Sequence, residues 1–336
     1  MALMRAAQYD RYGPPEVLYE GKAPVPQVPA GHILVRVQAT SINGGELSAR
    51  SGELKLLTGK RFPKGVGVDF VGEVADTGTG RSGLRTGDRV WGVLPRTAEA
   101  GAQTGAAAEY LTVDPQRVSL APGNLTPVEA ASVVAAVVPI IGLRDKAHLT
   151  RGERLLVRGA SGGMGSLAVQ VGKAMGAHVT GLAGPSNLDF VRSLGADEVF
   201  SYTTTGPADL GAFDVVFDTV GTELAAFRKL LTPKGRMVAI SFDLKHIARS
   251  FAYIAASAVH GSRRVRFFSG NPGRELFAEA TRLAESGQLR PVVDAVHPLS
   301  DIAAAHRAVE SGGVRGKRIV DIDGQNEGGI RENKSS

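Results

Sequence analysis

The chain has 336 residues and a formal net charge of +6, and 43% of its residues are hydrophobic. This composition describes a soluble globular protein of one large or two ordinary domains. The chain contains no cysteine, which excludes disulfides, thiolate catalysis and cysteine-based zinc sites, and which fits a cytoplasmic location.

Basic residues are scattered along the chain, apart from Arg263, Arg264 and Arg266. We therefore expect a solvated surface rather than nucleic-acid binding, and the positive balance suits an anionic cofactor. No membrane partner is expected, because the longest apolar stretch, Ala130 to Leu143, is shorter than the roughly 18 residues that a membrane span needs. The first seven residues lack the pattern of a secretory signal.

Residues 1–123 indicate a β-rich domain. Within residues 1–30, glycine and proline turn signals occur at 13–15, 24, 26 and 29. Residues 33–39 alternate side chains between two faces, which is the pattern of a half-buried strand. Further short strands are predicted at 69–75, 89–93 and 108–113. Short strands separated by glycine- and proline-rich turns are typical of a β-barrel.

Beyond Thr126, short apolar strands alternate with helices, and this alternation predicts a doubly wound parallel sheet over residues 124–270. The predicted strands are 154–159, 178–182, 198–202, 214–218, 236–241 and 265–269, and the helices between them include 187–194 and 222–231. For the C-terminal part we predict a helix at 274–286, an extended piece at 292–297, a helix at 300–311 and a strand at 318–322. The polar tail from Gly324 is expected to be disordered.

A glycine-rich stretch connects the first of these strands to a helical pattern. It reads A-S-G-G-M-G, from Ala160 through Ser161, Gly162, Gly163 and Met164 to Gly165. Strand, glycine turn and helix together form the usual pyrophosphate site of dinucleotides, where glycine lets the backbone approach the phosphates. The first glycine of the usual motif is replaced by Ala160, and a glycine-rich turn without any ligand fits the isolated string equally well.

The end of the second strand suggests NADP(H) rather than NAD. An acid at this position accepts the ribose hydroxyl of NAD, but here the strand runs into Gly184 and no acid occurs before Asp189. Ser186 and Asn187 could bind a 2′-phosphate at the helix start, and Tyr202 at the end of the third strand could reach it. In the alternative interpretation, Ser186 and Asn187 only cap the helix.

The chain resembles the zinc-independent medium-chain dehydrogenases/reductases of the quinone oxidoreductase and alkenal/enone reductase group. The strings that carry this resemblance are S-I-N-G-G-E-L-S-A-R-S-G (41–52), F-P-K-G-V-G-V-D-F-V-G-E-V (62–74), T-G-D-R-V-W-G (86–92), R-G-A-S-G-G-M-G (158–165), R-S-L-G-A-D (192–197), F-D-V-V-F-D-T-V-G (213–221) and G-K-R-I-V (316–320). The resemblance implies an α/β fold with two domains. A GroES-like catalytic β-barrel would comprise residues 1–123 and 271–323, and a Rossmann domain, 124–270, would bind the cofactor in the cleft between them.

The resemblance also bears on metal binding. Zinc-using relatives carry a Gly-His-Glu, and the matching residues here are Gly67, Val68 and Asp69. Valine cannot bind a metal, and the seven histidines show no paired spacing, so we expect no metal. The expected reaction is then hydride transfer to a quinone or to an activated double bond.

Relatives commonly have Asn-Pro-x-Asp followed by Tyr or Lys, and this chain departs from that pattern. Asn43 is kept, but Gly44 replaces the proline, Glu46 the aspartate and Ser48 the Tyr or Lys. We expect Asn43 to line the nicotinamide pocket, although asparagine before Gly-Gly is also an ordinary turn residue. Ser48 is either a catalytic residue or a bystander. Val138 stands where relatives often have a threonine near the nicotinamide.

Further cofactor contacts are inferred by resemblance at Val220, Ser241, Phe268, Ser269, Asn271 and Lys317. Residues 243–260 would cover the substrate pocket, with His246 and Tyr253 as possible donors, although no proton donor can be named. The implied function is an NADPH-dependent reductase acting, as a homodimer, on a hydrophobic enone or quinone. The alternatives are a dedicated enoyl reductase of a polyketide pathway and an inactive NADPH-binding protein.

Overall fold

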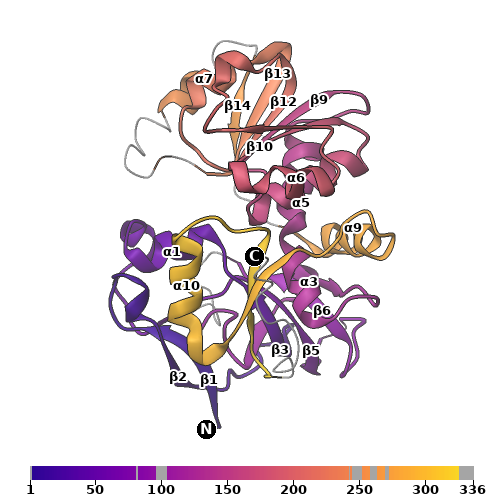
Figure 1. Ribbon diagram of the computed structural model, residues 1–336. Helices are drawn as coiled ribbons and strands as arrows, with labels where there is room; N and C mark the ends of the chain where they lie inside the picture. Colours follow the sequence, from indigo (N-terminus) through magenta and orange to yellow (C-terminus); the bar gives the residue numbers. More distant parts are fainter. Residues whose placement is uncertain are drawn as a thin grey trace. The chain divides into compact units, whose positions relative to one another are not determined.

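The structure is a computed structural model that describes residues 2–80, 82–95, 104–241, 243, 252–257, 263–268 and 272–324. Its chain folds into two compact units (Figure 1). The first unit comprises Met1–Ala135, Asn271–Glu285 and Pro291–Ser336, and the second comprises Ala136–Gly270 and Ser286–Arg290. Several predictions fall outside the described residues: most of the pocket cover with His246, the cofactor candidates Ser269 and Asn271, and the tail beyond residue 324.

The unit boundaries differ from the predicted ones in two places. Helix α3 (Pro127–Val133) belongs to the first unit, because it packs on strands β3 (Ile33–Ser41), β5 (Asp69–Asp76) and β16 (Lys317–Asp321). The short segment Ser286–Arg290 belongs to the second unit. The side chain of Gln170 holds the backbone of Arg290 there, accepting from its N–H at 2.7 Å and donating to its carbonyl at 3.2 Å.

Two sheets form the framework of the first unit. In the larger, seven-stranded sheet the order is β15 (Val293–Pro298), β16, β3, β5, β6 (Arg89–Val93) and β8 (Val118–Leu120), with β7 (Tyr110–Val113) also paired to β3. The smaller sheet has the order β2 (Tyr19–Pro24), β1 (Leu3–Tyr9) and β4 (Lys64–Gly65). Strands β15 and β16 lie far along the chain, so the C-terminal segment completes the barrel, as the GroES-like fold requires.

Strands β1 and β2 lie within residues 1–30, where the sequence indicates turn signals and predicts no strand. They pair antiparallel from Leu3 opposite Pro24 to Gln8 opposite Tyr19. Strand β1 contains no β-branched residue and has weak strand preference on its own, so pairing with distant residues decides its conformation. The unit also contains α1 (Gly44–Ser51) and α2 (Lys55–Thr58), which a purely β-stranded domain would lack.

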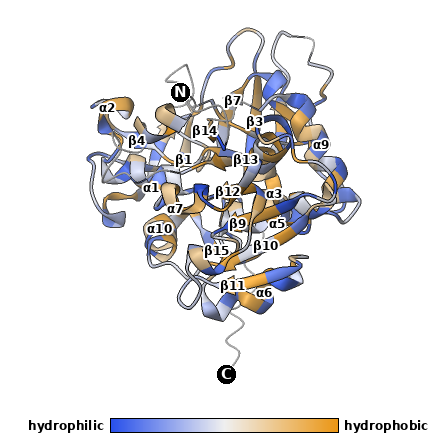
Figure 2. Ribbon diagram, turned by 90° about the horizontal axis from the view of Figure 1, so that it is seen from above, coloured by the Kyte–Doolittle hydropathy of each residue, from blue (hydrophilic) through white to orange (hydrophobic). Residues whose placement is uncertain are grey.

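The remaining helices of the first unit come from both parts of the chain. They are η1 (Pro15–Val17), η2 (Pro115–Arg117), α9 (Arg274–Glu285), η8 (Leu299–Asp301) and α10 (Ile302–Glu310). Helix α9 is amphipathic and buries Phe277, Ala280 and Ala284, which matches its mixture of hydrophilic and hydrophobic segments in Figure 2.

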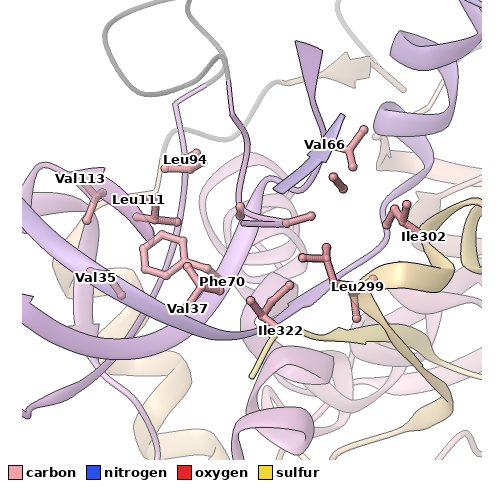
Figure 3. Packing of buried hydrophobic residues seen from close by; sticks show 14 of the residues in the cluster. Val35, Val37, Val66, Phe70, Leu94, Leu111, Val113, Leu299, Ile302 and Ile322 are labelled. Carbon is pink, nitrogen blue, oxygen red and sulfur yellow. The ribbon is translucent and has the colours of Figure 1, made fainter. Parts of the chain in front are cut away.

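The core of the first unit joins the N-terminal strands to the C-terminal segment. Phe70 on β5 is fully buried among Val35 and Val37 of β3, and Leu299 and Ile302 belong to the same cluster (Figure 3). Burying these side chains contributes roughly 1.5–3 kcal/mol each. The C-terminal segment is thus held to the barrel by apolar packing as well as by strand pairing.

The second unit is built on one parallel sheet of six strands. Its order is β11 (Glu198–Ser201), β10 (His178–Ala183), β9 (Arg154–Arg158), β12 (Phe213–Asp218), β13 (Leu231–Ala239) and β14 (Val265–Phe267). In chain order these strands run 3-2-1-4-5-6, which is the arrangement of a Rossmann fold. The helical segments of this unit are α4 (Val137–Ile140), π-helical η4 (Ile141–Lys146), α5 (Gly163–Ala174), η5 (Pro185–Asn187), α6 (Leu188–Ser193), η6 (Pro207–Asp209) and α7 (Leu224–Arg228). The predicted doubly wound sheet is therefore confirmed.

The predicted helix over residues 222–231 is too long. Helix α7 covers only Leu224–Arg228, and β13 begins at Leu231 rather than at residue 236. The early start follows from pairing, because Leu231 lies opposite Phe213 of β12 before the register shifts. Tertiary pairing here overrides the helical pattern of the local sequence.

One helical stretch, Pro127–Lys146, is long and apolar enough to cross a membrane by length and composition. Of its most apolar window, 78% is buried inside the protein, so it has the character of a core helix. The sequence estimate of its apolar part, Ala130 to Leu143, was shorter because Arg144 to Lys146 are charged.

Candidate functional site

The glycine loop of the second unit forms a close turn between β9 and α5. Gly159 has a φ of +68°, a conformation that favours glycine, and Gly162 is the N-cap of α5. A Cβ added at Gly165 would lie 2.0 Å from the carbonyl oxygen of Gly159. Only a glycine therefore lets the first turn of α5 pack this closely against the loop.

The start of α5 offers free hydrogen-bond donors. The backbone N–H groups of Gly163, Met164 and Gly165 donate to no other residue in the described part of the chain. These donors and the positive end of the helix macrodipole favour an anion at this point. The loop therefore fits the pyrophosphate of a dinucleotide. Ala160 is buried and its N–H donates to the carbonyl of Leu182 on β10, which fixes the loop to the neighbouring strand.

A buried ion pair supports the loops on either side of the glycine turn. Arg158, the last residue of β9, bonds Asp218, the last residue of β12, at 2.9 Å, and its guanidinium stacks on Phe227. Asp218 in turn accepts from the backbone N–H groups of Val220 and Gly221. The pair thus orders the backbone at the carboxyl ends of β9 and β12. The sequence analysis does not identify this pair, although a charge at the end of each of two buried strands signals a mutual partner.

The predicted ribose-binding residues gather next to the glycine loop. The side-chain amide of Asn187 donates to the Ser161 hydroxyl at 3.2 Å. The ring of Tyr202 lies beside Gly184, where an added Cβ would come within 3.2 Å of the Tyr202 hydroxyl. Tyr202 is 63% exposed and free to stack on a ligand. Asp189, the first acid beyond β10, is instead held by Arg192 on the surface.

The other predicted contacts of the second unit follow strands of the same sheet. Val220 follows β12 and is 43% exposed, Ser241 follows β13, and Phe268 follows β14 and lies near Gly142. Because the strands are parallel, these residues share the carboxyl edge of the sheet with the glycine loop, where ligands of this fold bind. Val138 lies on α4 and is partly buried. Tyr253 packs against the core, in keeping with a structural role.

In the first unit, strand register brings Asn43 and Lys317 together. Ser41 of β3 lies opposite Ile319 of β16 in an antiparallel pair, so Asn43, two positions after Ser41, meets Lys317, two positions before Ile319. The Lys317 ammonium donates to the Asn43 side-chain oxygen. Lys317 is only 4% exposed, and its Nζ lies 3.9 Å from Oδ2 of Asp69, at the start of β5.

Asp69 is the centre of this network. Its carboxylate accepts from the Ser41 N–H at 2.7 Å, the Ser41 hydroxyl at 2.6 Å and the Asn43 amide at 2.9 Å. Such a set of donors, with Lys317 nearby, compensates a carboxylate that is 1% exposed. Asp69 therefore holds Asn43 and the end of β3 in one arrangement.

Glu46 completes the network from α1. One carboxyl oxygen accepts from the Asn43 amide at 3.0 Å, and the other accepts from the Gly67 N–H at 2.8 Å. Burial, and next the nearby Asp69 charge, raise the pKa of Glu46 to about 7, although Asn43, Gly67 and Lys317 oppose this. Burial also lowers the pKa of Lys317. Burial therefore favours the protonated, neutral form of the Glu46 carboxyl group.

This arrangement constrains what Asn43 can contact. Its amide group is shared among Ser41, Glu46 and Asp69, and its oxygen already accepts from Lys317. One lone pair of that oxygen remains for a ligand. The Ser48 hydroxyl has no hydrogen bond to any residue that the structure describes, so the network does not include the second predicted catalytic residue.

The sequence interpretation treated Glu46 and Asp69 only as departures from a family pattern. Their roles depend on burial and on contacts between β3, β5 and α1, which spacing along the chain does not reveal. A usable signal was the loss of histidine at Val68 with an acid retained at Asp69. Among the described residues, no group of three or more His, Asp or Glu side chains is placed to hold a metal ion.

Comparisons with known proteins cover most of the chain. The family described as alcohol dehydrogenase GroES-like domain matches residues 29–123, and the family described as zinc-binding dehydrogenase matches residues 194–320. The chloroplast envelope quinone oxidoreductase homolog of Arabidopsis thaliana is 30% identical, over 95% of this chain and 98% of that protein. The NADPH-dependent alkenal/one oxidoreductase of the same plant is 30% identical, over 94% of this chain and 79% of that protein.

A solved structure shows the same fold. The quinone oxidoreductase from Coxiella burnetii superposes with a TM-score of 0.83 at 27% sequence identity, covering 96% of this chain and all of that chain. The two-domain α/β fold predicted from the sequence is thus shared by an enzyme whose structure has been solved.

Proposed function

Because the chain belongs to the medium-chain dehydrogenase/reductase superfamily, in its quinone oxidoreductase and alkenal/enone reductase group, we propose that this oxidoreductase uses NADPH to reduce a quinone or the C=C bond of an α,β-unsaturated carbonyl. The observation that carries the proposal is the glycine loop. It presents three free N–H groups at the start of α5, next to a strand end without a carboxylate.

The residues at the carboxyl edge of the sheet support NADPH over NADH. A 2′-phosphate would lie near Ser186, Asn187 and Tyr202, and the first acid beyond β10, Asp189, is exposed and paired with Arg192. A carboxylate facing the ribose would instead repel the phosphate. The relative named for its use of NADPH, the alkenal/one oxidoreductase, points to the same cofactor.

The chain's own residues would bind the cofactor, orient it and compensate its charge. When bound, the cofactor supplies a hydride, and a proton from another source completes the reduction. The glycine loop would hold the pyrophosphate, and Asn43, fixed by Lys317 and Asp69, would contribute to the nicotinamide pocket. Proximity and orientation of this kind are worth up to about 7–11 kcal/mol. We propose that the reaction proceeds without metal, which Val68 in place of a histidine supports.

The test is a kinetic one. We expect purified protein to oxidise NADPH faster than NADH when mixed with a panel of quinones, alkenals and aryl enones, followed by nicotinamide absorbance. Turnover with bulky polycyclic enones only would favour a dedicated biosynthetic enoyl reductase. Tight NADPH binding without oxidation by any acceptor would sink the proposal and leave a nucleotide-binding protein.

We further propose a homodimer formed through β14, the end strand of the six-stranded sheet. An end strand presents backbone groups that a second copy can pair with. Light scattering coupled to gel filtration tests this, and a monomeric mass would contradict it. A cytoplasmic location is also proposed, and the cysteine-free composition supports it.

A further inference from the structure

A cavity of the second unit lies at the edge of the parallel sheet opposite the glycine loop. It has a volume of about 440 Å³. Part of its wall is the first half of β13, with Lys234 and Arg236, and part is Arg263 and Arg264, just before β14. These are the amino ends of parallel strands, whereas the glycine loop follows the carboxyl end of β9. The cavity is therefore separate from the proposed cofactor site.

The wall of this cavity is strongly cationic. Lys234, Arg236, Arg263, Arg264 and Arg266 line it together with His148, and no Asp or Glu is found among the lining residues that the structure describes. Like charges on neighbouring strands repel each other and cost stability. An anion, either a protein carboxylate or a bound one, would therefore stabilise such a wall.

Two of these arginines are used to build the wall. The Arg236 guanidinium bonds both oxygens of Glu153, at 2.6 and 2.7 Å, and donates to the carbonyls of Ala147 and His148. Arg266 donates to the carbonyl of Lys146. Both therefore cap the end of the η4 helix and fix the geometry around the cavity.

The other cations keep unused donors. Lys234 and Arg264 are exposed, and neither side chain makes a hydrogen bond or ion pair with another residue in the described ranges. Toward other described residues, the Arg263 side chain donates only through its Nε, in a 3.4 Å contact to the Thr232 carbonyl. Glu153 pairs with Arg236, and within the described ranges Lys234 and Arg264 have no carboxylate partner.

We propose that this cavity binds a small molecule bearing a diphosphate group. A guanidinium fork matches phosphate oxygens in a bidentate way, and several cations around one cavity suit a multiply charged anion better than a single carboxylate. The volume admits a compact ligand and not a folded chain. Free pyrophosphate and the diphosphate of a nucleotide share this chemistry.

Calorimetric titration with inorganic pyrophosphate tests the proposal. The protein is first saturated with NADPH, so that the glycine loop is filled, and a parallel titration uses ADP to separate the two sources. We expect one binding event that weakens as salt is added. The double variant Lys234→Gln/Arg264→Gln should weaken this binding at least about tenfold, because charge-assisted hydrogen bonds are lost. Its affinity for NADPH should not change.

The matched control is Lys60→Gln/Arg61→Gln, which removes one lysine and one arginine from an exposed segment of the first unit. Pyrophosphate should bind this variant as it binds the unaltered protein. Tighter binding of ADP than of pyrophosphate would identify a nucleotide site, and the reverse would identify a site for the bare anion. Absence of binding by both ligands, or an equal loss in the control variant, would overturn the proposal.

Discussion

The Lys317 ammonium donates to the side-chain oxygen of Asn43, across the register of β16 and β3, and it is the only cation that the described structure places against the buried Asp69 carboxylate. Replacing it, Lys317→Met, leaves that carboxylate without a countercharge. Breaking a buried pair from one side costs about 3–5 kcal/mol. We expect a loss of this size in the free energy of unfolding, measured by urea denaturation.

A double variant tests whether the loss comes from the charge pair or from altered packing. In Lys317→Met/Asp69→Asn neither charge remains, so the loss should be smaller than the sum of the two single losses. Strict additivity in this double-mutant cycle would mean that Lys317 and Asp69 do not compensate each other.

Glu46 predicts an unusual pH dependence of stability. Its pKa is about 7 in the folded protein and 4.5 as usual when unfolded, so the folded protein holds the proton more tightly. The stability from this group is complete below pH 4.5 and is lost as pH rises through 7. Relative to Glu46→Gln, the free energy of unfolding of the unaltered protein should fall by on the order of 3 kcal/mol between those limits. Stability curves that run parallel over this pH range would refute the buried-acid assignment.

The glycine loop and the strands around it were predictable because their signals are local. The loop sequence from Ala160 to Gly165, the apolar strands and the absence of an acid before Asp189 all lie within one short part of the chain. The same holds for β14 and α9, whose patterns are read from consecutive residues.

The network around Asn43 was not predictable in this way. It depends on the pairing of β3 with β16 and on Asp69 at the start of β5, and these segments are far apart in sequence. Spacing along the chain carries no information about which acid is buried or which lysine approaches it. Strand β1 was not predictable for the same reason, since its pairing with β2, and not its sequence without β-branched residues, decides its structure.

Alanine substitutions at two glycines of α5 distinguish an effect on the loop geometry from an effect on helix packing. In Gly165→Ala the new Cβ meets backbone, 2.0 Å from the Gly159 oxygen, so the loop must shift. In Gly172→Ala it meets the end of the flexible Leu155 side chain, which can move. We expect Gly165→Ala to weaken NADPH binding about tenfold or more and Gly172→Ala to change it little. Fluorescence titration measures both, and equal effects would argue against the loop as the pyrophosphate site.

The end of β10 should control cofactor choice. Ser186→Asp puts a carboxylate beside the position inferred for the 2′-phosphate, and the ratio of kcat/KM for NADPH to that for NADH should fall about tenfold or more. The control is Asp189→Asn, which alters an exposed acid already paired with Arg192. An unchanged ratio in Ser186→Asp would place the phosphate elsewhere.

Buried His306 on α10 predicts sensitivity to acid. Its ring is fully buried, and neither nitrogen has a hydrogen-bond partner among the residues described. Burial, and next the charge of Arg50, lower the pKa of His306 from 6.5 to about 3. The unfolded chain therefore binds the proton first as pH falls, and the stability contributed by the neutral ring, complete above pH 6.5, is lost down to about pH 3.

Replacing this ring by an apolar one, His306→Phe, should flatten the acid limb of stability. The difference in the free energy of unfolding between the variant and the unaltered protein should grow by up to about 5 kcal/mol as pH falls from 6.5 to about 3. It should grow less if the larger ring strains the site. Urea denaturation at a series of pH values measures it, with His178→Phe on the surface of the second unit as control. If both variants follow the acid dependence of the unaltered protein, protonation of His306 does not drive acid unfolding, and the carboxylates that hold ion pairs, such as Glu109 with Arg5, would have to account for it.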